Sequence, residues 1–162
     1  MICLVKIAGL ILLAVACAGI GLAESRKLSE REKQLEGFLR FLTAAQAEIR
    51  YSSLPVGELI FSHRRSALVL EACAQLMEQG EPFQQAWRQA SQTGGRQDVS
   101  FFRAFGRELG TTDMEGQMSH LKLYRELTAA RLREASADRE KKGRLYRQLG
   151  IFGGIAVALV LW

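Results

Sequence analysis

The sequence has few of the residues from which catalytic and metal sites are built. Its 162 residues include only two histidines and three cysteines, which are His63, His120, Cys3, Cys17 and Cys73. The cysteines lie too far apart for a disulfide framework or a zinc-ligand spacing. The only Gly-Gly pair before the C-terminal end, Gly94-Gly95, lacks the lysine-containing frame of a phosphate-binding loop. We therefore predict a protein that is not an enzyme and has no catalytic residue, metal or cofactor.

Charge is nearly absent from both ends of the chain. Only Lys6 precedes Glu24, and no charged side chain follows Arg147. The first 23 residues are long enough for a helix through about 30 Å of hydrocarbon. The last 14 residues give about 21 Å at about 1.5 Å per residue, which is short for a span, although Trp162 can lie at the far interface. We predict transmembrane helices at residues 1–23 and 148–162.

The charged middle, residues 24–147, contains 21 basic and 17 acidic residues, and basic residues follow the first apolar run and precede the second. Because basic flanks stay on the cytoplasmic side, we expect a two-span protein of the cell membrane with its middle in the cytoplasm. The alternative is cleavage near Ala16 or Ala23, which would give a secreted or lipid-anchored helical binding module. The single Lys6 and the basic flank after Ala23 argue against cleavage.

Alternating patterns typical of strands are also nearly absent, so the predicted fold class is all-α. Residues 28–49 carry one apolar helical stripe, formed by Leu28, Leu35, Phe38, Leu42, Ala45 and Ile49. Pro55 ends this helix and can open the next, as can Pro82. We expect a compact helical bundle of about six helices at residues 24–147, between the two transmembrane helices.

Several local features of the bundle can also be predicted. Asp98 is expected to cap a helix that ends before Gly110, and Thr112 begins a capping box with Glu115. Leu68 is expected on the buried side of the helix that ends at Gly80. Large apolar residues such as Trp87 are expected in the core rather than on a docking face.

Two basic runs, at residues 63–65 and 139–147, raise the question of nucleic acid binding. Aromatic residues are thinly interleaved with them, and the second run is explained as a membrane flank. We therefore predict that the lipid bilayer is a partner and nucleic acid is not.

Four stretches of the chain carry a resemblance to a known family. They are EIRYSSLPVGELI at residues 48–60, MEQGEPFQQAW at 77–87, FGRELGTTDMEGQ at 105–117 and YRQLGIFGGIAVALVLW at 146–162. Together they resemble the stage III sporulation protein AB family, which belongs to a channel of endospore-forming bacteria. The family is similar to the cytoplasmic bundle of the inner-membrane platform protein of type II secretion.

The resemblance implies a non-enzymatic platform protein in the mother-cell membrane around the forespore. Its implied partners are a cytoplasmic secretion-type ATPase and other sporulation channel membrane proteins, including those that form rings, and a homo-oligomer is also compatible with it. The bundle would either transmit movement from the ATPase into the membrane or act as a passive structural anchor.

Four polar residues within the family pattern are the predicted partner-binding residues, namely Glu48, Glu58, Asp113 and Gln117. Other pattern residues, such as Pro55 and Gly110, are explained by helix ends. Polar side chains are harder to assign to packing, although Asp113 suits a helix N-terminus.

Overall fold

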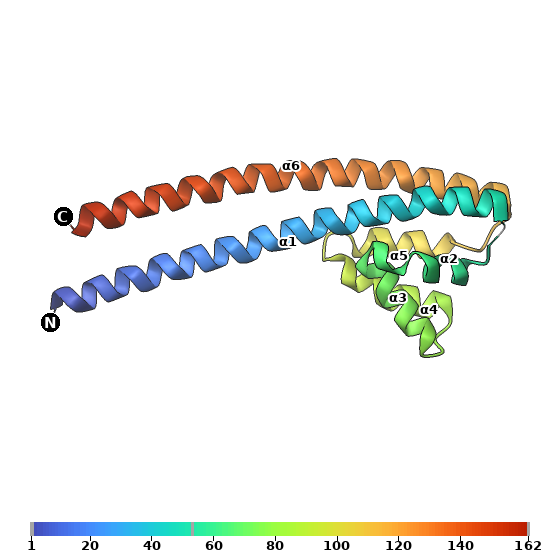
Figure 1. Cartoon of the computed structure of the whole chain (residues 1–162), viewed down its shortest axis with the longest axis horizontal. Helices are drawn as coiled ribbons and strands as arrows, with labels where there is room; N and C mark the ends of the chain where they lie inside the picture. The colour runs from blue at the N-terminus through green and yellow to red at the C-terminus, as the bar shows by residue number, and fades with distance from the viewer. Residues whose placement is uncertain (1, 53, 162) are drawn as a thin grey trace. The chain divides into compact units, whose positions relative to one another are not determined.

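In the computed structural model, every regular secondary-structure element is a helix. The structure describes the backbone of residues 2–52 and 54–161, and the side chains of Ala23 and residues 25–51, 54–145 and 148. Its elements in order are α1 (Ile2–Ser52), α2 (Val56–Ser62), η1 (Arg64–Ser66), α3 (Leu68–Glu78), α4 (Phe83–Ala90), η2 (Ser91–Gly94), α5 (Val99–Glu108) and α6 (Met114–Leu161) (Figure 1). Here η marks a short 3-10 helix. No strand occurs within the described residues, which confirms the all-α prediction.

The chain divides into two compact units. One is Arg31–Glu134, which contains α2 to α5 and the adjoining parts of α1 and α6, and the other is Met1–Glu30 with Ala135–Trp162. Among the described residues, no helix has a stretch long and apolar enough to cross a membrane. The predicted spans, residues 1–23 and 148–162, lie outside the described side chains except for Ala23 and Gln148.

Phe38 of α1 lies at the centre of the core of the Arg31–Glu134 unit. Its fully buried ring meets the rings of Phe102 and Phe105 edge-on, with centroids 4.9 and 5.1 Å apart. It also contacts Trp87 of α4, at a centroid distance of 6.4 Å. Edge-to-face pairs of this kind add to the gain from burying the rings. Aromatic side chains from α1, α4 and α5 therefore converge on one point.

The apolar stripe predicted for residues 28–49 is confirmed, since all six of its residues are buried. The prediction for Leu68 is wrong, because its side chain is 55% exposed. Leu68 is the first residue of α3, and its backbone N–H donates to Oε1 of the Gln34 side chain at 3.0 Å. The buried face of α3 is instead formed by Val69, Leu70, Cys73 and Ala74.

Asp98 lies at the N-terminal end of α5, but its carboxylate does not cap that helix as predicted. Oδ2 accepts a hydrogen bond from Nε of Arg31 at 2.7 Å, and Oδ1 accepts one from Nη1 of Arg131 at 2.9 Å. Only 1% of the Asp98 side chain is exposed. Charge-assisted bonds from guanidinium groups are stronger than a neutral cap bond, so this carboxylate joins α1, α5 and α6 within the unit.

Replacing this carboxylate is expected to destabilise the protein. Asp98→Asn removes the buried negative charge that Arg31 and Arg131 both contact, at a cost of about 3 kcal/mol in the free energy of unfolding. Asp113→Asn is the matched control, because Asp113 is exposed and asparagine caps a helix as well as aspartate does. Urea unfolding of the full chain, followed by circular dichroism, measures both. A loss below about 1 kcal/mol for Asp98→Asn would contradict this role.

Candidate functional site

Two of the four predicted partner-binding residues lie in the first turns of α6. Asp113 is the N-cap residue, and its Oδ1 accepts a hydrogen bond from the backbone N–H of Gly116 at 3.0 Å. The expectation that Asp113 serves a helix N-terminus is confirmed. The prediction that Thr112 begins the capping box is wrong, because the side chain that accepts from the first turn of α6 is that of Asp113. Gln117 follows on the next turn, and its N–H donates to the carbonyl of Asp113 at 2.9 Å.

The side chain of Gln117 closes the turn between α5 and α6. Its Oε1 accepts from the N–H of Gly110 at 3.0 Å, and its Nε2 donates to the carbonyl of Glu108 at 3.2 Å and to Oγ1 of Thr112 at 2.8 Å. Gly110 has a φ of 80°, a conformation that side chains disfavour, and Gln117 is 6% exposed. The Gln117 amide therefore has an internal role at the C-terminal end of α5.

Glu48 and Glu58 lie in different surroundings. Oε1 of Glu48 is 2.8 Å from Nε2 of His63, which joins α1 to the turn after α2. The ring of His63 meets Phe41 edge-on, with centroids 5.9 Å apart. Glu58 is exposed in the first turn of α2, where a negative charge suits the helix dipole. Of the four predicted residues, Glu58 and Asp113 are the exposed carboxylates.

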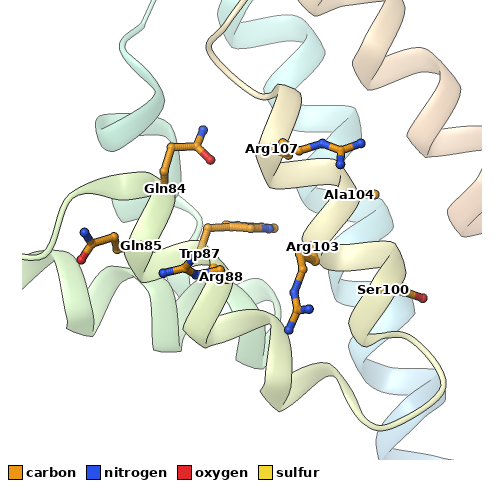
Figure 2. A pocket seen from close by; sticks show the side chains of 8 residues that line it. All are labelled: Gln84, Gln85, Trp87, Arg88, Ser100, Arg103, Ala104 and Arg107. Carbon is orange, nitrogen blue, oxygen red and sulfur yellow. The ribbon is translucent and has the colours of Figure 1, made fainter.

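A surface pocket between α4 and α5 is a candidate site that sequence reasoning missed. It has a volume of about 530 Å³ and is lined by Gln84, Gln85, Trp87, Arg88, Ser100, Arg103, Ala104 and Arg107. Figure 2 shows Trp87 reaching from α4 toward α5, with Arg88 beside it on α4 and Arg103 and Arg107 on α5. A volume in this range is typical of ligand pockets.

The floor of the pocket is fixed by Trp87. Its indole Nε1 donates to the carbonyl of Phe102 at 2.6 Å, and only 1% of the residue is exposed. A side chain at Gly106 would overlap this indole ring, so glycine is what allows α4 and α5 to approach. Nε2 of Gln84 donates to the carbonyl of Gly106 at 3.0 Å, a second bond between the two helices.

The pocket is positively charged. Arg88, Arg103 and Arg107 are exposed, and the only acidic residue between Phe83 and Arg107 is Asp98, which is already bound to two arginines. Glu108 lies nearby, with its Oε1 3.8 Å from Nη2 of Arg107. The spacing of Arg103 and Arg107 on one helix face, with Arg88 after a buried tryptophan, was the available sequence signal. This spacing predicts a pocket only once it is known that α4 packs on α5.

Two potential nucleophiles among the described residues, Cys73 and Tyr124, have raised pKa values. Burial raises the pKa of the Cys73 thiol to about 12, so the thiolate is scarce at neutral pH. Burial, and then the charge of Glu108, raise the pKa of Tyr124 above its ordinary value. In the part of the chain that the structure describes, no three His, Cys, Asp or Glu residues form a metal site. The three arginines that line the pocket between α4 and α5 make it suited to binding anionic groups.

The contact between Trp87 and Gly106 gives a prediction. Gly106→Ala forces the indole away from α5, which overpacks the core and strains the bond to Phe102, so the unfolding free energy should fall by about 1–3 kcal/mol. At Gly143 of α6 an added Cβ meets nothing within 4 Å, so Gly143→Ala should stabilise the helix by up to about 1 kcal/mol. Thermal unfolding of both variants measures whether stability falls for Gly106→Ala and rises for Gly143→Ala. Equal changes in stability would contradict the close approach of α4 and α5 at Gly106.

Comparison with known proteins agrees with this architecture. A solved structure of stage III sporulation protein AB has a TM-score of 0.57 to the chain and 20% sequence identity, and the match covers 69% of this chain and 98% of that one. At that identity the likeness supports the fold alone. The comparison with curated proteins gave no match. The family model of stage III sporulation protein AB matches residues 6–162, nearly the whole chain. The chain therefore belongs to the stage III sporulation protein AB family.

Proposed function

We propose that the chain is a non-enzymatic platform protein of a secretion-like membrane channel that forms during sporulation. Family membership supplies the role in sporulation. In this proposal, residues 1–23 and 148–162 span the mother-cell membrane around the forespore, and residues 24–147 lie in the cytoplasm. The basic flanks of the two apolar runs support that orientation.

The observation that carries the proposal is the continuity of α1 and α6. Each is one uninterrupted helix that contains an apolar end of the chain and also supplies core residues to the Arg31–Glu134 unit. Phe38 comes from α1, and Leu121 and Tyr124 come from α6. A partner bound to the unit would therefore act on the same helices that enter the membrane.

Two partners are proposed for the cytoplasmic unit: a secretion-type ATPase and the ring-forming proteins of the channel. The exposed carboxylates Glu58 and Asp113 are available for such contacts. Glu48 and Gln117 contribute less directly, because their side chains already hold the turns at His63 and Gly110. A partner that binds near Glu48 and Gln117 would contact the turns at His63 and Gly110 as well as these two side chains.

Two alternatives to the platform function can be distinguished from it by experiment. A passive anchor would hold the channel rings without binding the ATPase. A secreted or lipid-anchored binding module would lack the first residues after cleavage near Ala16 or Ala23. The intact mass of the chain recovered from membranes separates this last alternative from the platform proposal, because the platform keeps both apolar ends.

Glu58→Lys should weaken recruitment of the ATPase by about tenfold, which corresponds to about 1.4 kcal/mol. Glu71→Lys is the matched control, since Glu71 is also an exposed acidic residue in the first turn of a helix, α3. The measurement is the amount of ATPase that co-purifies with the full chain from sporulating cells. Equal recruitment by wild type, Glu58→Lys and Asp113→Lys would contradict docking at these carboxylates, and no recruitment by the wild type would favour the passive anchor.

A further inference from the structure

We propose that the pocket between α4 and α5, named here the arginine pocket, binds an acidic segment of a partner protein. The arginine pocket comprises Arg88, Arg103 and Arg107 around the floor formed by Trp87. This inference rests on the proposed function, because it assigns a binding surface and a partner chemistry to the platform unit. The carboxylates Glu58 and Asp113 are not among the residues that line this pocket.

The first argument is charge. Within the described residues, no ion pair or side-chain hydrogen bond occupies the guanidinium groups of Arg88 and Arg103, and Arg107 has only the exposed Glu108 at 3.8 Å. The one other acidic residue of this stretch, Asp98, is buried and bound to Arg31 and Arg131. The positive charge of the pocket is therefore left for an external anion. Arginine clusters are the usual receptors for acidic motifs.

The second argument is spacing. Arg103 and Arg107 are one turn apart on α5, and Cβ atoms at that spacing lie about 5–6 Å from each other. A segment with two carboxylates one helical turn apart matches this spacing. Arg88 belongs to α4, the other wall of the pocket, so a third acidic group can be bound there. Planar guanidinium groups can each bind a carboxylate through two parallel hydrogen bonds.

The third argument is shape, which favours a peptide over other polyanions. The arginines border a hollow of about 530 Å³, which side chains of a peptide can enter and the flat surface of a bilayer cannot. The ring of Trp87 is 1% exposed, so it offers no face on which a nucleic acid base could stack. Ala104 adds an apolar wall, and the exposed amide of Gln85 can pair with a peptide backbone.

The test measures binding of a defined probe to the purified full chain in a neutral detergent. The probe is a fluorescein-labelled helical peptide with glutamate pairs spaced four residues apart, and the reference peptide has glutamine at the same positions. Fluorescence anisotropy should show binding of the glutamate peptide to the wild type. Arg103→Glu/Arg107→Glu should weaken it about tenfold or more, because two charge-assisted contacts become repulsive.

Arg65→Glu/Arg133→Glu is the matched control, because Arg65 and Arg133 are exposed residues outside the pocket and the double change alters net charge equally. Its effect should stay below about threefold, since distant surface charges are screened at physiological salt. A peptide with lysine in place of glutamate should bind the Arg103→Glu/Arg107→Glu variant better than the wild type. If that variant does not fold, as judged by circular dichroism, Arg103→Gln/Arg107→Gln takes its place with the same expected direction.

Three outcomes would overturn the proposal. If both double variants lost the same affinity for the glutamate peptide, the binding would be general charge attraction. If the glutamine peptide bound as tightly as the glutamate peptide, the pocket would not recognise carboxylates. Binding of vesicles with anionic lipids that depends on Arg103 and Arg107, without binding of the peptide, would assign the pocket to the membrane. None of these outcomes affects the test of ATPase recruitment through Glu58. The platform proposal can therefore fail or hold independently of the arginine pocket.

Discussion

The position of α4 against α5 depends on the indole ring of Trp87. The ring lies against Gly106 of α5, donates to the carbonyl of Phe102 and reaches the ring of Phe105, with centroids 5.4 Å apart. The same ring contacts Phe38 of α1. Because one side chain joins the aromatic core to the floor of the arginine pocket, the surface that binds anions is set by the packing beneath it.

The second constraint is the buried carboxylate of Asp98. It holds the N-terminal end of α5 between Arg31 and Arg131, and the guanidinium of Arg131 lies over the ring of Phe101, 4.6 Å from its centroid. A charge buried to this degree has to be compensated by well-placed partners. The same two arginines neutralise Asp98, the one acidic residue between Phe83 and Arg107, so its charge does not offset that of the pocket arginines.

The sequence predicts the helices better than it predicts their contacts. The stripe at residues 28–49 is found because helical periodicity is local, and Pro55 and Pro82 mark helix starts for local steric reasons. The sequence predicts a helix cap at Asp98 because Asp98 precedes α5, whereas its actual partners, Arg31 and Arg131, are remote in sequence. The arginine pocket was missed for the same reason, since its walls are two separate helices.

Gln117 and Leu68 illustrate two further limits. The polarity of Gln117 suggested partner contact, whereas its amide satisfies backbone groups of a turn whose geometry depends on Gly110. Leu68 fits the helical period but lies at the first position of α3, where its side chain remains outside. In both cases the position at the end of an element, rather than the residue type, decides the environment.

The most direct test of the account is the membrane topology of the chain, because the platform function requires the Arg31–Glu134 unit to lie in the cytoplasm. Single cysteines at the exposed Gln92 and beyond Trp162 would be labelled with an impermeant reagent in intact vegetative cells, with Cys3, Cys17 and Cys73 replaced. Permeabilised cells provide the control for reactivity at Gln92. The account predicts protection at Gln92 and labelling beyond Trp162. Labelling at Gln92 in intact cells would contradict it and favour the secreted binding module.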